Sequence, residues 1–316
     1  MTISDPGMDC AQAFARTLLS LAAVDERICV VVNDSTDTNH LDAFVETYPE
    51  RVVDVGIAEQ NMVGVAAGIA NSGRIPFVHS AACFLTGRAL EQIKIDVAYN
   101  NANVKLCGFV AGLAYGPCGG THHAVEDLAW TRSIPNLDVL APATPIDTAA
   151  VLRAELKRRG PAYLRIISKV VVPEVFQASR EFEPSSWLCH GSDVALIGTG
   201  LTTSRLVEAA RCLVDKSVSA GVLHICSISP LDHNVIAEAA RTYRRLVVVE
   251  EHVTNGGLGG AVSEVVVQTT PVPVLLIGVP NVYAPIGPAS FLYEHFGLTA
   301  PQIADRVAAW LDLPRQ

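Results

Sequence analysis

Short apolar runs alternate along the whole chain with segments whose apolar residues recur at helical spacing. In the first half, the runs predict strands at 27–33, 52–55, 75–79, 104–110, 137–141 and 162–167. The intervening periodicity predicts helices at 58–71, 87–99 and 144–159. Strands that alternate with helices in this way favour parallel sheets covered by helices, which is an α/β fold.

The second half repeats this pattern on a smaller scale. It predicts strands at 193–198, 221–226, 246–250 and 274–277, and helices at 204–216, 234–241 and 259–268. Residues 299–302 read as a capping box that opens a last helix. Residues 171–192 have no clear period and contain two prolines, so we interpret them as a linker. We therefore expect two domains, 1–170 and 193–316, each a mainly parallel sheet flanked by helices.

Composition narrows the class of protein. Half of the 316 residues are hydrophobic and only 17% are charged, which is typical of a compact globular chain. The net charge of −9, without any Lys/Arg-rich run, argues against a nucleic-acid partner. Without 18 consecutive apolar residues or a secretory signal, neither a membrane span nor export is expected. Eight scattered cysteines without a CxxC pair favour free thiols in a reducing cytoplasm.

The segment 54–62, which reads DVGIAEQNM, places Glu59 in the first turn of a helix that is otherwise apolar or small. A first-turn acid commonly does no more than complement the helix dipole, and on composition alone that interpretation is favoured. The second segment, 116–129, reads GPCGGTHHAVEDLA and follows a buried strand. It places His122 at the carboxyl edge of the sheet, where α/β sites usually lie, although a surface histidine at a helix entry is equally compatible.

Adjacent histidines point to different sides of a helix, so a metal site built from His122 and His123 is not expected. No other His/Cys spacing indicates zinc.

Several blocks together resemble the transketolase family, which includes deoxyxylulose-phosphate synthase. The resemblance covers residues 8–310, and its order and spacing make it specific. The blocks are GIAEQNM at 56–62, GRA and EQI at 87–93, GGTH at 119–122, EDLA at 126–129, IPN at 134–136, EEH at 250–252 and GGLG at 256–259. The resemblance implies a pyrimidine-binding domain followed by the smaller transketolase C-terminal domain.

The family's Gly-Asp-Gly motif, which binds the diphosphate and a divalent metal, does not occur in this sequence. The resemblance therefore implies a split enzyme with thiamine diphosphate, in which an N-terminal-half partner subunit binds most of the Mg²⁺ (or Ca²⁺). It also implies self-association to an α2β2 heterotetramer and transfer of a two-carbon ketol unit between small-molecule substrates. A beta subunit of a 2-oxoacid dehydrogenase is a rival, disfavoured by the GGTH and IPN blocks. A non-catalytic scaffold is another, disfavoured by retention of Glu59 and His122.

By the same resemblance, Glu59 hydrogen-bonds N1′ of the aminopyrimidine and Phe84 stacks on that ring, although Phe84 is equally compatible with a core phenylalanine. His122 is expected to contact substrate oxygens and to assist proton transfer. Asp34 matches a loop acid of the family, or simply caps a turn. The full expected set of cofactor contacts is Glu59, Phe84, Ile57, Asp34 and Arg88. The expected substrate contacts are His79, His122, Cys118 and Lys169.

Departures from the family concern the substrate. Phosphate-facing arginine, histidine and arginine positions of sugar-phosphate transketolases correspond here to Ala11, Val110 and Ser168, with Lys169 as the nearest substitute. The loop's usual acidic pair is Pro117 and Cys118. Because phosphate recognition relies on cations, we expect a specialised or unphosphorylated substrate. Two alternatives stay open: the partner supplies the cations, or the alignment is off by one or two residues and Arg165 or Lys169 fills a role.

Overall fold

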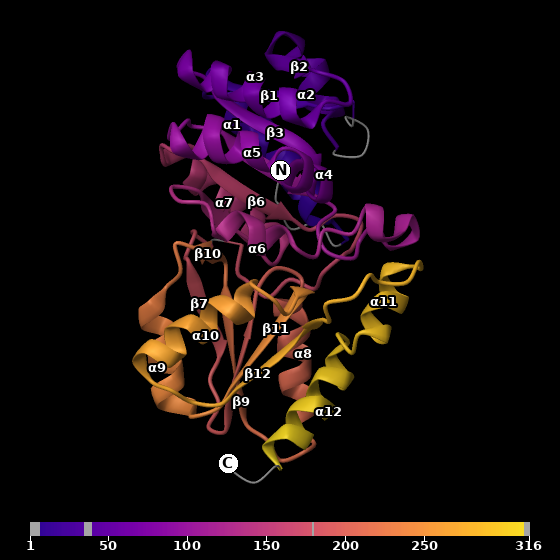
Figure 1. The fold of residues 1–316 in the computed structure, drawn as a ribbon, viewed down its shortest axis with the longest axis vertical. Helices are drawn as coiled ribbons and strands as arrows, with labels where there is room; N and C mark the ends of the chain where they lie inside the picture. The colour runs from indigo at the N-terminus through magenta and orange to yellow at the C-terminus, as the bar shows by residue number, and fades with distance from the viewer. Residues whose placement is uncertain (1–6, 35–39, 179, 313–316) are drawn as a thin grey trace.

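The computed structural model describes residues 7–34, 40–178 and 180–312, and it consists of two sheets joined end to end (Figure 1). In both sheets most strands are parallel and helices cover the faces, so the two-domain α/β prediction is confirmed. The central strands are buried along their whole length, as β1 (Ile28–Val32) illustrates. Burial on both faces is what produces continuous apolar runs in the sequence. In the described part of the chain, no helix is long and apolar enough to cross a membrane.

The first sheet has seven strands in the order β10-β5-β6-β4-β3-β1-β2, and β10 is antiparallel to its neighbour β5. Its strands are β1, β2 (Val52–Asp54), β3 (Ile75–Ala81), β4 (Lys105–Phe109), β5 (Asp138–Leu140), β6 (Ala162–Ile166) and β10 (Ser227–Ser229). The α-helices of this half are α1 (Cys10–Ala22), α2 (Asp42–Thr47), α3 (Glu59–Asn71), α4 (Ala82–Arg88), α5 (Leu90–Gln92), α6 (Asp127–Arg132) and α7 (Pro145–Lys157). Tighter or wider turns form η2 (Pro49–Arg51), the π-helical η3 (Ile93–Tyr99) and η4 (Gly116–Thr121).

The second sheet has five strands in the order β12-β11-β8-β9-β7. They are β7 (Ser185–Cys189), β8 (Val194–Gly198), β9 (Ala220–Ile225), β11 (Leu246–Val253) and β12 (Val274–Val279). Its helices are α8 (Thr202–Val214), α9 (His233–Tyr243), α10 (Leu258–Thr269), α11 (Ala289–His295) and α12 (Ala300–Leu311). Helices α9 and α10 lie on one side of this sheet, and α8 and α12 on the other (Figure 1).

Several local predictions were wrong. The helix expected at 87–99 is broken, because Ala89 leaves helical geometry at φ −102°, ψ 17° between α4 and α5, and the chain continues as the π-helical η3. The predicted linker 171–192 contains β7, which pairs antiparallel with β9. The capping box at 299–302 does not form: the Thr299 hydroxyl bonds the Gln302 side chain and leaves the helix amides uncapped. Helix α1, which no prediction included, starts with a capping box between Asp9 and Gln12.

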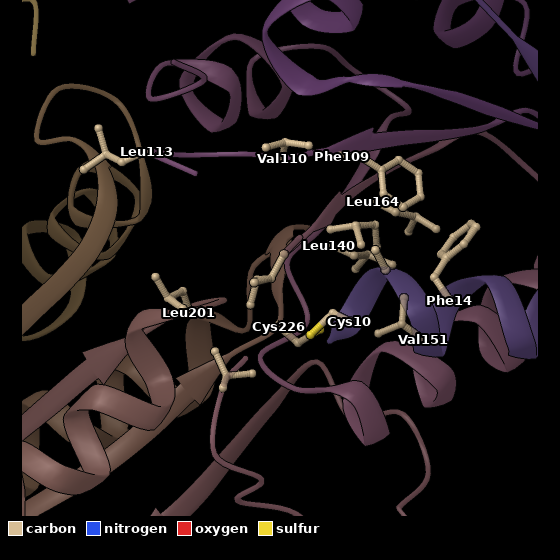
Figure 2. Packing of buried hydrophobic residues seen from close by; sticks show 14 of the residues in the cluster. Cys10, Phe14, Phe109, Val110, Leu113, Leu140, Val151, Leu164, Leu201 and Cys226 are labelled. Carbon is tan, nitrogen blue, oxygen red and sulfur yellow. The ribbon is translucent and has the colours of Figure 1, made fainter. Parts of the chain in front are cut away.

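The two domains share more than a linker. Strand β10 belongs to the second half of the chain but adds to the first sheet beside β5. One continuous apolar cluster includes residues of both domains, and Figure 2 shows Leu201 and Cys226 of the second domain with Leu140 and Cys10 of the first. Because the core continues across the boundary, the relative position of the sheets is fixed by packing.

A buried arginine closes this boundary. Arg165 on β6 donates from Nε to both carboxylate oxygens of Asp127, at 3.2 and 2.8 Å. Its Nη2 donates to the carbonyls of Ala124 and Glu251, at 3.2 and 3.0 Å. The Tyr163 hydroxyl donates to the same Asp127 carboxylate at 2.7 Å. A guanidinium is tolerated in a protein interior only when its donors are satisfied in this way.

A second buried charge anchors α7 to the sheet. Lys105, on β4, is fully buried, and burial lowers the pKa of its ammonium group. Its Nζ donates to Glu155 Oε2 at 3.1 Å and to the carbonyls of Gly160 and Arg158 at 2.8 and 3.2 Å.

We predict that Glu155→Ala lowers the free energy of unfolding by about 3–5 kcal/mol, because it leaves the Lys105 charge buried without its counter-ion. The measurement is denaturant unfolding at pH 7. Replacing both partners, Lys105→Met with Glu155→Leu, should recover most of the loss, whereas Glu208→Ala on the exposed side of α8 should stay within about 0.5 kcal/mol of wild type. A Glu155→Ala loss no larger than that of Glu208→Ala would show that the pair is not stabilising.

Candidate active site

Glu59 is the first residue of α3, and its carboxylate is buried with only 5% of its surface exposed. Asn33, which follows β1, donates from Nδ2 to Glu59 Oε1 at 2.9 Å. Arg88, the last residue of α4, approaches the same oxygen at 3.1 Å, although more than half of its own side chain is exposed. Glu59 is therefore a buried acid held from two directions, rather than an exposed acid that only complements the helix dipole.

A pocket of about 530 Å³ opens beside this carboxylate. It is lined by Ile57, Ala58, Glu59, Gln60, Asn61 and Arg88. Ile57 is 83% exposed, which places an apolar side chain at the rim of the pocket. The pocket thus combines a buried acid, an apolar rim and a long, partly exposed cation, a combination suited to a planar, partly polar ring.

Phe84 connects Glu59 to the segment 116–129, which carries His122. The Arg88 guanidinium lies 4.0 Å from the centre of the Phe84 ring, and the Phe84 ring meets His122 edge-on at 5.0 Å. Phe84 is only partly buried, so it is not a closed-in core phenylalanine. The two predicted segments, which are far apart in the sequence, therefore belong to one continuous group of side chains.

His122 follows η4 and is half-buried. Its Nδ1 lies 2.8 Å from the Thr121 hydroxyl, and its ring meets Tyr115 edge-on at 5.6 Å. His123 is turned away and buried, and burial lowers the pKa of its imidazole. Of these two histidines, His122 thus faces the group that contains Phe84.

The second domain holds the glycine-rich loop in place. Leu113 donates its backbone N–H to Glu251 Oε1 at 2.9 Å. Gly112 has φ +69°, and a Cβ there would lie 2.3 Å from the Glu251 carboxylate carbon. A Cβ at Gly116 would lie 2.2 Å from the Gly287 carbonyl oxygen. Glycine is required at both positions because the two domains approach here closely, and this contact sets the place of His122.

Lys169 lies near the histidine side of the site. Its Nζ is 4.5 Å from the centre of the Tyr115 ring, and its backbone N–H donates to Asp9 at 3.1 Å. Cys118 is exposed within η4. Lys169, Tyr115 and His122 thus form a second group, in which an exposed cation and a histidine share one aromatic ring.

Two expected contacts are not at the pocket. Asp34 is exposed, takes φ +63°, and its backbone N–H donates to Asp54 Oδ1 at 3.3 Å. It does not line the pocket in the described part of the chain. His79 lies on β3, has no exposed surface, and its ring stacks on Phe109 at 4.9 Å with Phe14 edge-on. In this structure the strand therefore directs the His79 side chain into the core, away from the pocket at Glu59, and its contact with substrate stays a prediction.

Sequence reasoning missed Asn33, which it treated only as the polar end of a strand. Its position at the carboxyl end of β1 was the available signal, since ligand-contacting residues of parallel sheets gather at that edge.

The three positions where this chain lacks the family's phosphate-facing arginine or histidine are all buried. Ala11, Val110 and Ser168 have between 0 and 2% of their surface exposed. The Val110 N–H donates to the Ser168 hydroxyl at 3.2 Å, so these two lie side by side. Arg165 is committed to Asp127 and to two carbonyls, and it is not available to a substrate. Lys169 is the exposed cation beside this group.

A group of potential metal ligands lies elsewhere, at the domain boundary. Asp147, His224 and Cys226 are buried with their ligand atoms within 4.8 Å of one another. Asp147 already accepts from Arg180 Nε at 2.7 Å, from the Ala143 N–H at 2.9 Å and from His224 Nε2 at 3.1 Å. With its oxygens occupied and a guanidinium beside it, we interpret this cluster as a polar contact between α7 and β9.

An acid at the start of a helix, an aromatic ring and a loop histidine, gathered at the carboxyl edge of a parallel sheet, define an α/β protein with a ligand site at that edge. Two protein-family models match the sequence and identify the family. "Transketolase, pyrimidine binding domain" matches residues 6–170 and "Transketolase, C-terminal domain" matches residues 186–303. The chain belongs to the transketolase family.

Individual relatives agree. A subunit of the apulose-4-phosphate transketolase of Phocaeicola vulgatus is 36% identical over 92% of this chain and 93% of its own length. The 6-deoxy-6-sulfo-D-fructose transketolase subunit of a Clostridium species is 34% identical over 90% of this chain and 89% of its own. A solved "Split gene transketolase, inactive beta4 tetramer" superposes with a TM-score of 0.88 at 37% identity, covering 98% of this chain and all of that one. By contrast, this chain spans 46% of the 1-deoxy-D-xylulose-5-phosphate synthase of Heliobacterium modesticaldum, at 36% identity.

His79 generates a prediction about pH. Burial lowers the pKa of its imidazole to about 3, against an ordinary value of 6.5. In the unfolded chain it takes up a proton below pH 6.5, whereas the folded chain cannot do so until about pH 3. Stability is therefore lost as the pH falls, and by pH 5 this histidine contributes a loss of about 2 kcal/mol.

We expect His79→Phe to flatten the fall in unfolding free energy between pH 7 and pH 5 by about that amount. The change of slope is the measurement, so a constant packing offset from the larger ring does not matter. His295→Phe, at an exposed histidine of α11, is the matched control and should leave the slope unchanged. Equal slopes in all three proteins would contradict the assignment.

Proposed function

We propose that this chain is one subunit of a two-component, thiamine-diphosphate-dependent transketolase that transfers a two-carbon ketol unit. The observation that carries the proposal is the buried Glu59 carboxylate at the wall of an open pocket, with Asn33 and Arg88 on the same oxygen. Relatives of nearly equal length are themselves named as subunits, which supports the two-component assignment.

The residues of the pocket fit an aminopyrimidine. Glu59 offers an acceptor to a ring nitrogen, Ile57 offers an apolar contact at the rim, and Phe84 offers an aromatic face. When bound, thiamine diphosphate would supply the carbon nucleophile. Glu59 would hold the proton at N1′, which controls the tautomer of the ring, and Asn33 keeps the carboxylate aimed into the pocket.

The second group of side chains would serve the substrate. His122 is oriented by the Thr121 hydroxyl, so one ring nitrogen is held while the other is available to a substrate oxygen. A histidine held in this way is suited to move protons to and from a hydroxyl group during cleavage of the carbon–carbon bond. Lys169 would meet an anionic or strongly polar group farther along the substrate.

A partner subunit completes the site in this proposal. The sequence has no Gly-Asp-Gly motif for a diphosphate and its metal. We assign those functions, including Mg²⁺, to an N-terminal-half chain, and we propose an α2β2 assembly with the cofactor between subunits. A similar chain is described as an inactive beta4 tetramer, which supports the need for a partner.

The substrate is proposed to be a specialised one. Ala11, Val110 and Ser168 are buried and uncharged, so they cannot hold a phosphate by charge. The names of the two subunit relatives refer to apulose 4-phosphate and to 6-deoxy-6-sulfo-D-fructose. The exposed cation beside His122, Lys169, is compatible with one anionic group presented differently from that of xylulose 5-phosphate.

We predict that Glu59→Gln, in the complex with the partner subunit, lowers kcat for donor cleavage by about 10²–10⁴-fold with unchanged thermal unfolding. Glutamine keeps an acceptor for Asn33 but cannot exchange a proton with a ring nitrogen. Glu46→Gln, on the exposed side of α2, is the matched control and should retain activity. Normal turnover by Glu59→Gln would refute the role, and the non-catalytic scaffold would then be favoured.

We also predict that xylulose 5-phosphate is a poorer donor than the best of apulose 4-phosphate, 6-deoxy-6-sulfofructose, fructose and hydroxypyruvate, by at least about tenfold in kcat/KM. Lys169→Met should raise KM for anionic donors and leave KM for neutral ones unchanged, because only the former use its charge. A clear preference for xylulose 5-phosphate would mean that the partner supplies the missing cations.

A further inference from the structure

A second cavity lies at the opposite edge of the first sheet from Glu59. It has a volume of about 420 Å³ and is formed where β1, β3 and β4 begin and where α3 and α7 end. We call it the basic cavity. Its lining is Arg27, Ala70, Asn71, Gly73, Arg74, Ile75, Asn100, Asn101, Ala102, Asn103, Leu156, Lys157, Arg158 and Arg159.

The charge of this lining is unlike that of the rest of the protein. Among the described residues that line it, five side chains are cationic, four are asparagines and none is acidic. The chain as a whole carries 32 acidic and 23 basic residues. The cations come from three separate segments of the sequence, which folding brings together around one cavity. A local positive field of this kind raises the concentration of anions even when the net charge is negative.

Two of the cations in the wall of the cavity are held in place by ion pairs. Arg27 makes a paired contact with Asp25, at 2.9 and 2.7 Å. Arg158 lies 2.8 Å from Asp138 and 3.3 Å from Glu155, and it also donates to the Pro161 carbonyl. These contacts orient both guanidinium groups before any ligand arrives, which reduces the entropy lost on binding.

The other three cations are not committed in this way. Arg74, Lys157 and Arg159 have no ionic partner among the residues that the structure describes. The backbone between them is held, since Ile75 donates its N–H to the Arg27 carbonyl at 2.9 Å and Gly160 donates to Asn103 Oδ1 at 3.1 Å. Uncommitted cations on a fixed frame, with amide donors between them, match the needs of a phosphate-type group.

A structural explanation competes with this one. The carboxyl ends of α3 and α7 meet at the cavity, and basic residues there complement the helix dipoles. That explains Lys157, which is in the last turn of α7. It does not explain Arg27, which directly precedes β1, or the lack of any acid among the lining residues.

We propose that the basic cavity binds a small polyanion, a metabolite with two phosphate-type groups, at a site separate from the pocket at Glu59. The volume admits a molecule of that size, and Arg74, Lys157 and Arg159 leave three uncommitted charges for its two anionic groups. This proposal does not rest on the transketolase assignment, because none of its residues touches the Glu59 pocket.

The test is calorimetric titration of the full-length chain with inorganic pyrophosphate at constant ionic strength, so that general screening does not change. We expect saturable binding with one site per chain. Arg74→Glu with Arg159→Glu should weaken it at least tenfold. Arg211→Glu is the control, because Arg211 is an exposed cation in the last turn of α8 and should leave binding unchanged.

The chain is then titrated with a sugar bisphosphate and with a nucleoside diphosphate. The ligand with the lower Kd identifies the chemical class of the natural polyanion. Absence of saturable pyrophosphate binding would overturn the proposal. Equal binding by Arg211→Glu and by the Arg74/Arg159 double variant would overturn it too. Thermal unfolding of each variant without ligand is measured alongside the titrations. If the double variant loses stability while wild type binds no pyrophosphate, the cations serve only to stabilise the carboxyl ends of the two helices, and the proposal fails.

Discussion

The guanidinium of Arg165 is the contact on which the arrangement of the two domains depends. It belongs to the first sheet, yet it satisfies a carbonyl of β11 in the second domain and the carboxylate that opens α6. A buried cation allows few alternative positions for its acceptors, because any displacement leaves a charge without hydrogen bonds. Its four contacts therefore define where β6, α6 and β11 meet. The glycine-rich loop with His122 spans this junction, so the place of the histidine follows from it.

The candidate active site is accordingly built by both domains. Glu59, Asn33 and Phe84 are supplied by the first sheet and its helices, at the edge where parallel strands end. The loop that carries His122 is instead fastened by Glu251 and by the backbone at Gly287. The described part of the second domain contributes no residue to the pocket at Glu59, yet it fixes the geometry between the acid and the histidine.

Patterns in the sequence predicted the features that depend on periodicity. Buried parallel strands leave continuous apolar runs. Glu59 was recognised through the resemblance of its segment to the transketolase family, since the composition of its helix alone favours an acid that only complements the helix dipole. Features that depend on contacts between distant segments were not predictable. Strand β10 is three residues that look like a loop until β5 is beside them. His79 looked like a polar residue at the end of a strand, but the seven-residue length of β3 extends beyond it and its neighbours are Phe14 and Phe109. The break at Ala89 likewise has no periodic signature.

Strand β10 comes from the second half of the chain but pairs in the first sheet, and this limits where evolution can divide such a chain. Dividing the polypeptide in the segment between the sheets would remove an edge strand from the first sheet and leave an unpaired strand edge on β5. It would also separate Arg165 from one of its acceptors inside a continuous apolar core. The two sheets are thus one structural unit. A recombination crossover between them would expose in both halves the apolar surface that now forms one shared core.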